Sequence, residues 1–154
     1  MLDKTDRLII DVLQQDGRAS VETVADRIGL TPTPTRRRIR RLERDGAITT
    51  YAAIADPEQC DLAMTVYVFV RLEHRSLKHI DKFERAIRNL AEVVRCDLVS
   101  GSYDYLMLIH LQDMATYNQY LHSVIANVPG IAQIESSVVI GNIKSTHRLA
   151  LTRG

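Results

Sequence analysis

The chain has 154 residues, with 20 lysines and arginines against 19 aspartates and glutamates, for a formal net charge of +1. That length suits one ordinary domain or two small ones, and 45% hydrophobic with 25% charged residues is typical of a globular protein. No apolar run approaches the roughly 18–20 residues of a membrane-spanning helix, and the charged start lacks the apolar core of a signal peptide, which argues against secretion.

Three short helices are predicted in the first 45 residues. Apolar residues recur at helical spacing after Asp3 and again after Ser20, and both residue types favour the N-cap position of a helix. A third helix is expected to begin after Thr31, because the two prolines near its start fall in its first turn, where they break no helical hydrogen bond. The short link at residues 29–31 gives the second and third helices the spacing of a helix-turn-helix.

The third helix carries six arginines among residues 36–44. At about 100° per residue, Thr35, Ile39 and Leu42 share one stripe that must face the core. Most of the arginines point the other way, with Arg38 nearer the buried side. Guanidinium groups neutralise phosphates and can form two hydrogen bonds with a guanine edge, so the outward row suits DNA. Because a recognition helix reads bases mainly from its N-terminal end, we assign the earlier residues of the row to base edges and the later ones to phosphates. The base-edge candidates are Thr33, Arg36, Arg37 and Arg40, and the phosphate candidates are Arg41 and Arg44.

The alternative for this helix is a solvated basic face whose arginines pair locally with Glu43 and Asp45. The position of the arginines on the second helix of a helix-turn-helix favours DNA. Residues 47–54 have β-favouring character, and we expect them to form a small hairpin, or wing. The turn-like residues 56–59 then offer a natural domain boundary.

The rest of the chain has the pattern of a ferredoxin-like domain. Valine-rich, apolar and aromatic runs predict strands at residues 64–73, 93–99, 105–111 and 131–140. Amphipathic helices are predicted at residues 77–90 and 114–128. The order β-α-β-β-α-β predicts one sheet with both helices on one face and with the first and third strands, the most apolar ones, at its centre. We therefore expect an α+β protein with a first domain at 1–56, a linker at 57–63 and a second domain at 64–154.

At residues 2–10, 28–34 and 40–48 the chain resembles the leucine-responsive (Lrp/AsnC) family of bacterial and archaeal transcription regulators. Residues 101–105 (GSYDY) are similar to the effector-loop motif of that family, and residues 144–149 also fit, so the resemblance spans nearly the whole chain. It implies an N-terminal winged helix-turn-helix that binds DNA. It also implies a C-terminal ferredoxin-like domain that dimerises, assembles further and binds small effectors, usually amino acids.

The GSYDY loop has the chemistry to bind a zwitterion. The Asp104 carboxylate would accept the ammonium group, and Ser102 with backbone amides near Gly101 would donate to the carboxylate. Composition alone favours a hairpin turn in which Asp104 caps backbone N–H groups and the tyrosines pack. The resemblance implies instead that the loop faces a pocket between neighbouring dimers. On that reading the candidate effector residues are Gly101, Ser102, Tyr103, Asp104 and Tyr105, with Ser136 and Ser137 nearby.

The sequence gives little support for a metal site, a cofactor site or a catalytic residue. Cys60 and Cys96 form no C-x-x-C or metal-ligand pattern, so we expect free thiols in a reducing cytoplasm. The five histidines show no ligand spacing, and no P-loop or G-x-S-x-G motif occurs. We therefore expect no metal, no cofactor and no catalytic residue.

These patterns predict a cytoplasmic, sequence-specific transcription regulator that responds to an amino acid. The expected partners are pseudo-palindromic double-stranded DNA, the effector and further copies of the chain, in a homodimer that assembles to a tetramer or octamer. Two other classes stay open. One is an enzyme similar to sirohaem decarboxylase subunits, which resemble this two-domain architecture, and the other is an amino-acid-binding module that regulates a partner enzyme. A decarboxylase would have no reason to keep arginines along an exposed helix.

Overall fold

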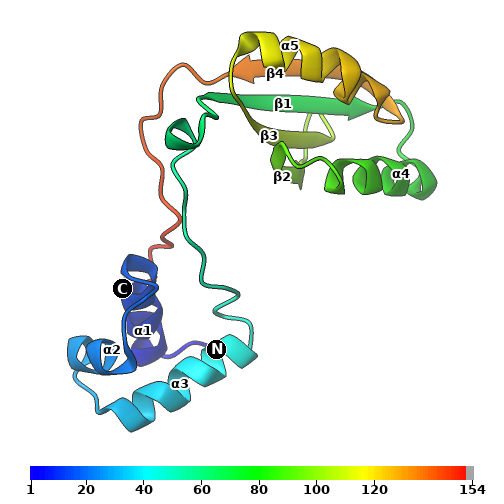
Figure 1. Cartoon of the computed structure of the whole chain (residues 1–154). Helices are drawn as coiled ribbons and strands as arrows, with labels where there is room; N and C mark the ends of the chain where they lie inside the picture. Colours follow the sequence, from blue (N-terminus) through cyan, green and yellow to red (C-terminus); the bar gives the residue numbers. More distant parts are fainter. Residues whose placement is uncertain (152–154) are drawn as a thin grey trace. The chain divides into compact units, whose positions relative to one another are not determined.

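The computed structural model describes residues 1–151, which divide into two compact units (Figure 1). The N-terminal unit contains Met1–Ile54 together with the tail from Ile143, and the C-terminal unit contains Ala55–Asn142. Among residues 1–151, no helix combines the length and the hydrophobicity that a membrane span requires.

The N-terminal unit is built from three helices around a small apolar core. These are α1 (Lys4–Gln15), α2 (Val21–Ile28) and α3 (Pro32–Arg44). As predicted, Asp3 caps α1, and it forms a reciprocal capping box with Asp6, while the Ser20 hydroxyl accepts from the backbone N–H of Thr23 at the start of α2. The core side chains are Ile9, Ile10, Val12, Val24, Ile39 and Leu42, all buried.

The turn between α2 and α3 depends on a glycine. Gly29 has φ +69°, in the left-handed region that glycine adopts without a steric penalty. Thr31 occupies the N-cap position of α3, but its side chain makes no capping hydrogen bond. Instead, the Thr35 hydroxyl donates to the Thr31 carbonyl at 3.0 Å. The predicted start of the helix after Thr31 is confirmed.

The segment after α3 differs from the prediction. Residues 47–55 contain no strand, so the expected wing is not formed. Ile48 donates its backbone N–H to the Leu42 carbonyl at 3.0 Å, and the Tyr51 hydroxyl donates to Glu43 at 3.0 Å. A tight hairpin needs glycine, asparagine or aspartate in its turn, and residues 47–54 contain none of them. β-Favouring composition alone therefore leaves this run extended and mostly exposed.

The C-terminal unit has the predicted ferredoxin-like order. Its strands are β1 (Met64–Leu72), β2 (Val93–Leu98), β3 (Tyr105–Leu111) and β4 (Ile131–Val138). Its helices are α4 (Leu77–Arg88) and α5 (Met114–Ser123), with short 3-10 turns η1 (Glu58–Cys60) and η2 (Ile125–Asn127). The sheet order is β2-β3-β1-β4 with antiparallel neighbours, which confirms β1 and β3 as the central strands.

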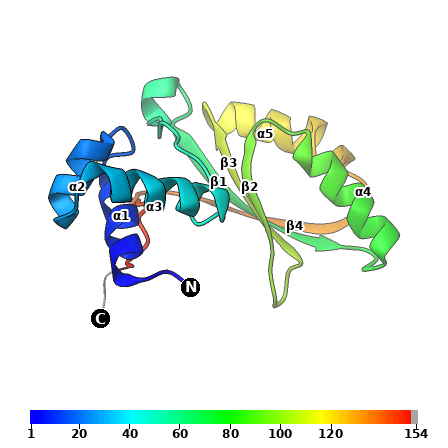
Figure 2. The same cartoon turned by 90° about the horizontal axis from the view of Figure 1, so that it is seen from below.

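One face of the sheet is covered and the other is open. Figure 2 shows α4 and α5 on the same face. The side chains of β1 and β3 that point to these helices are fully buried, among them Val68 and Met107, and they pack with Phe83 of α4. On the opposite face Tyr67 is paired with Leu108, and Phe69 with Leu106. We call these four residues the open-face apolar set. Tyr67 is exposed and the other three are half-buried, since no helix within residues 1–151 covers them.

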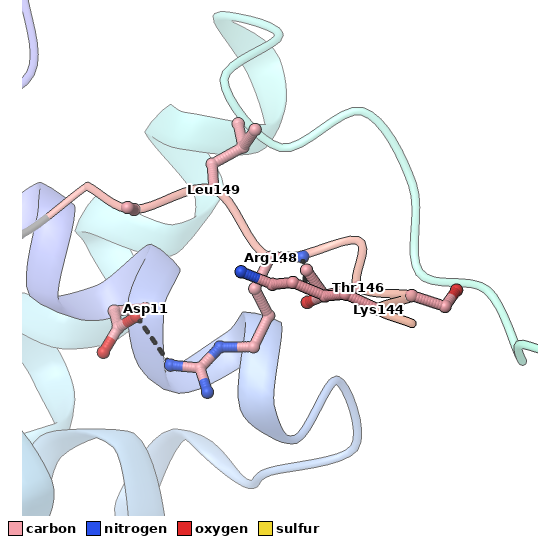
Figure 3. A pocket seen from close by; sticks show the side chains of 7 residues that line it. Asp11, Lys144, Thr146, Arg148 and Leu149 are labelled. Carbon is pink, nitrogen blue, oxygen red and sulfur yellow. Dashed lines mark hydrogen bonds and ion pairs between the residues drawn. The ribbon is translucent and has the colours of Figure 1, made fainter. Parts of the chain in front are cut away.

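The tail after β4 lies against α1 rather than in the unit to which the sequence assigned it. The Gln14 side chain donates to the Leu149 carbonyl at 3.1 Å and accepts from the Leu149 N–H at 2.6 Å. Arg148 forms an ion pair with Asp11 at 3.2 Å (Figure 3). Leu151 packs against the apolar core of the three helices. Apolar burial and these hydrogen bonds explain the docking, and neither is visible in a local sequence pattern.

Candidate nucleic-acid interface and effector loop

The outward face of α3 is a row of arginines. Thr35, Ile39 and Leu42 are buried, as predicted, so the opposite side of the helix faces away from the core. Six residues of that side line one shallow hollow of about 400 Å³. They are Thr33, Arg36, Arg37, Arg40, Arg41 and Arg44. The structure thus brings together all the residues that the sequence assigned to DNA.

The arginines of this row differ in how they are engaged. Arg37 and Arg40 form no ion pair with any residue in the described part of the chain. Arg36 pairs with Glu22 at 3.3 Å and Arg44 with Asp45 at 3.1 Å. Both pairs are solvent-exposed, and an exposed ion pair contributes about 0–1 kcal/mol, so a phosphate can replace the carboxylate.

Arg38 and Arg41 converge on a carboxylate that the sequence did not single out. Asp6 is only 1% exposed; it accepts from Arg38 Nη1 at 2.8 Å and from Arg41 Nη2 at 2.5 Å. Arg38 also donates to Asp3 at 2.6 Å, and that bond lowers the pKa of Asp3 and raises the pKa of Arg38. Arg38 is therefore turned toward the unit, as its helix position predicts. Arg41 is held by Asp6 while its side chain stays 42% exposed.

The carboxylate of the GSYDY loop has partners within the chain. Asp104 is largely buried; its Oδ2 accepts from the Leu72 N–H at 2.9 Å, and its Oδ1 pairs with Arg75 Nε at 2.8 Å. This is the backbone-capping role that composition alone favoured for Asp104. Gly101 has φ +141°, which favours glycine at the tip of the loop. Sequence reasoning missed Arg75, because no motif marks it and the two residues lie 29 positions apart.

The two tyrosines of the loop have different environments. Tyr105 is 3% exposed, its ring lies 4.6 Å from that of Phe83, and its hydroxyl donates to Glu84 at 3.0 Å. Burial and the nearby Glu84 raise the pKa of Tyr105. Tyr103 instead packs beside Phe69 on the open face of the sheet, and its hydroxyl donates to Glu135. Tyr105 is thus a core residue, whereas Tyr103 lies at the surface.

The two candidate serines lie on opposite faces of β4. Ser136 is the register partner of Val68 on the helix side, where its hydroxyl bonds with that of Tyr117. Ser137 pairs with Tyr67 on the open face. The seven candidate effector residues therefore do not surround one point of a single chain.

The described residues contain no group of three histidine, cysteine, aspartate or glutamate side chains placed to hold a metal ion. Of the two cysteines, Cys60 is exposed, and burial raises the pKa of the Cys96 thiol to about 11. A thiol with a raised pKa is a poor nucleophile at neutral pH.

Comparison with known proteins covers both units. Residues 2–43 match the AsnC-type helix-turn-helix domain, and residues 65–149 match the Lrp/AsnC ligand binding domain. The leucine-responsive regulatory protein of Escherichia coli K12 is 37% identical over 150 residues, which covers 97% of this chain and 92% of that protein.

Solved structures show the same similarity. A transcriptional regulator from Neisseria meningitidis in complex with L-Met superimposes with a TM-score of 0.94 at 31% identity, covering 99% of this chain and 98% of that one. An AsnC family transcriptional regulator from Agrobacterium tumefaciens gives a TM-score of 0.92 at 33% identity, with 97% of each chain covered.

Proposed function

The chain belongs to the Lrp/AsnC family of DNA-binding transcriptional regulators with an amino-acid-binding domain, and from this premise we propose how its residues divide the work. Helix α3 enters the major groove, with Arg37 and Arg40 on base edges and Thr33 and Arg36 beside them. Arg41 and Arg44 contact phosphates. The observation that carries this assignment is that Arg37 and Arg40 are exposed and form no ion pair with a described residue.

The physical argument rests on what a free guanidinium can do in a groove. It presents two parallel N–H groups to a guanine edge, and such a bidentate contact contributes about 1–3 kcal/mol of base discrimination. An arginine already committed to a buried carboxylate cannot rearrange to do this. Arg37 and Arg40 can, and they lie in the first three turns of α3 on its outward side.

The test replaces each of these residues with alanine. A binding site is first selected from random duplex DNA with the unmodified protein. We expect Arg37→Ala and Arg40→Ala each to weaken binding to that site roughly 5- to 150-fold, which is about 1–3 kcal/mol per lost base contact. Arg85→Ala, an equal loss of charge on the exposed side of α4, is the matched control. Folded variants that bind the selected site as tightly as this control would contradict the assignment.

We also propose that the protein is an isologous dimer formed through the open face of the sheet. The open-face apolar set supports this, because it presents aromatic and leucine side chains that none of the described helices covers. Two-fold symmetry would present two copies of α3 to the DNA, so the operator would be pseudo-palindromic. Further assembly to a tetramer or octamer, and a cytoplasmic location beside the DNA, complete this proposal.

For the effector we propose an amino acid held at the GSYDY loop. The Neisseria relative is an L-Met complex and the E. coli relative is leucine-responsive, which supports a small apolar amino acid. Each carboxylate oxygen of Asp104 has one bond within the chain and a further lone pair for the ammonium group. Backbone amides at Gly101 and Ser102, with Tyr103, line the same loop. Tyr105 is a core residue and stabilises the loop.

The remaining candidates, Ser136 and Ser137, lie on opposite faces of the sheet. Ser137 faces the open side of the sheet, which a neighbouring chain can cover, so we propose it as the serine nearer the ligand. Ser136 is bonded to Tyr117 and positions α5 against β4. The exposed arginine row favours a DNA regulator over the decarboxylase-like enzyme and over the enzyme-regulating module.

A further inference from the structure

The most buried charge of the described residues lies behind the DNA-binding helix. Asp6, in the first turn of α1, is 1% exposed. Its carboxylate accepts three hydrogen bonds, from the Asp3 N–H at 3.2 Å, from Arg38 at 2.8 Å and from Arg41 at 2.5 Å. With Asp3 also bonded to Arg38, two carboxylates and two guanidinium groups form one closed network between α1 and α3.

Stability alone does not explain this arrangement. Burying a carboxylate is expensive even when it is paired, and apolar residues of similar volume often serve a core equally well or better. The network also joins elements that already share an apolar core through Ile9, Ile39 and Leu42. What the carboxylate adds is a fixed orientation for two arginines on successive turns of α3.

The two arginines are left in different states. Arg38 bonds both Asp3 and Asp6 and is 28% exposed, so it is withdrawn from the outward row. Arg41 gives one guanidinium nitrogen to Asp6, remains 42% exposed, and lines the hollow together with Arg37 and Arg40. A long arginine side chain has high rotamer entropy, and Asp6 removes much of that freedom before DNA binds.

We propose that Asp6 is the positioning residue of the DNA interface, which holds Arg38 away from DNA and presents Arg41 to one backbone phosphate in a fixed orientation. This inference rests on the proposed function of α3. Arginines that move freely bind any phosphate and raise the affinity for all DNA alike, whereas a fixed contact helps only in the correct register. Asp6 therefore acts on the ratio of specific to non-specific binding.

The test is Asp6→Asn in the full chain, with Asp16→Asn as control. Asp16 is exposed, also lies at α1, and forms no ion pair with a described residue, so the control matches the loss of one negative charge. Asparagine keeps only one acceptor oxygen and cannot hold both guanidinium groups, so at least one of them becomes mobile, and Arg38 still has its bond to Asp3. We expect the slope of log K against log salt on non-specific duplex to steepen by about 1–2 relative to the control. The specific-to-non-specific affinity ratio should fall roughly tenfold, as for the loss of one oriented contact.

Two further variants apply even if Asp6→Asn does not fold. Arg41→Gln should reduce the salt slope on the selected site by about 1, because one phosphate contact is lost. Arg38→Gln should leave that slope unchanged while it lowers thermal stability. Circular dichroism establishes that each variant is helical before its affinity is compared.

The possible results distinguish a positioning role of Asp6 from a purely structural one. If Asp6→Asn is folded but matches Asp16→Asn in slope and affinity ratio, Asp6 is only a structural acid and the inference is wrong. Equal slope changes for Arg38→Gln and Arg41→Gln overturn it as well, because Arg38 would then contact DNA. Loss of binding in Arg37→Ala and Arg40→Ala tests the proposed function separately, since neither residue contacts Asp6 by an ion pair.

Discussion

At the scale of single residues, the role open to a side chain depends more on its bonding partners than on its residue type. Asp104 has the right chemistry to hold an ammonium group, but both of its oxygens already accept bonds, from Leu72 and Arg75. Arg75 is 66% exposed, so most of its guanidinium can still donate to another group. The pair Asp104–Arg75 therefore offers a negative and a positive site side by side, which suits the two charges of a free amino acid.

We expect this pair to govern effector binding. Asp104→Asn removes the charge that attracts the ammonium and the partner that orients Arg75, so affinity should fall about 10- to 100-fold, the loss of one charged hydrogen bond of about 1.5–3 kcal/mol. Arg75→Ala should weaken binding less. Calorimetric titration with whichever of the twenty amino acids the unmodified protein binds measures both effects, and Arg85→Ala serves as control. An unchanged titration for folded Asp104→Asn would rule out its role.

At the scale of elements, the tail is the feature that most changes how the N-terminal unit is built. It follows β4 in sequence, yet residues 143–151 belong to the N-terminal unit. One glutamine of α1, Gln14, bonds both backbone groups of Leu149, as a neighbouring strand would. The three-helix unit is thus joined to the rest of the chain at two points, after α3 and through the tail.

The glutamine contact predicts a local effect on stability. Gln14→Ala removes two hydrogen bonds at a partly exposed site, where the net contribution is about 1 kcal/mol per bond or less. We expect the Leu149 amide to exchange its hydrogen faster by roughly tenfold, since 1.4 kcal/mol corresponds to that factor. Gln119→Ala is the matched control, because Gln119 is exposed on α5 in the other unit. Equal exchange in the two variants would show that the tail does not depend on Gln14.

At the scale of the whole molecule, one face of the sheet is not covered by any helix of the part of the chain that the structure describes. The open-face apolar set lies at the centre of the sheet, on β1 and β3. An antiparallel sheet in a two-layer domain commonly packs one face on the core and exposes polar residues on the other. Exposed apolar patches of this kind are enriched at interfaces, which supports the proposed dimer.

We expect a charge on this face to disrupt self-association. Leu108→Glu should weaken the association constant at least about 100-fold, because a carboxylate would be buried against an apolar face without a partner. Sedimentation equilibrium measures the loss as a shift toward the monomer mass. Leu77→Glu introduces the same charge on α4 at a residue that is 81% exposed, and it should leave assembly unchanged. If both variants associate like the unmodified chain, the dimer uses another surface.

Local sequence patterns predicted most of the fold. The three N-terminal helices, the strand order with β1 and β3 central, and the outward direction of the arginine row all follow from residues close together in sequence. Apolar periodicity reports which side of an element is buried, and two residues such as Ile39 and Leu42 suffice to orient a helix. The wing was wrong because β-favouring composition without a turn residue does not make a hairpin.

Pairing between distant residues needed the folded chain. Which arginines are free depends on Asp6, more than thirty positions away, and the role of Asp104 depends on Arg75. Any carboxylate suits any guanidinium, so composition cannot tell which of many possible ion pairs will form. Only packing brings two such groups within 3 Å and excludes water from them. The sequence alone therefore predicted which side of α3 faces outward. The buried carboxylate of Asp6 and the docking of the tail depend on contacts that only the tertiary structure shows.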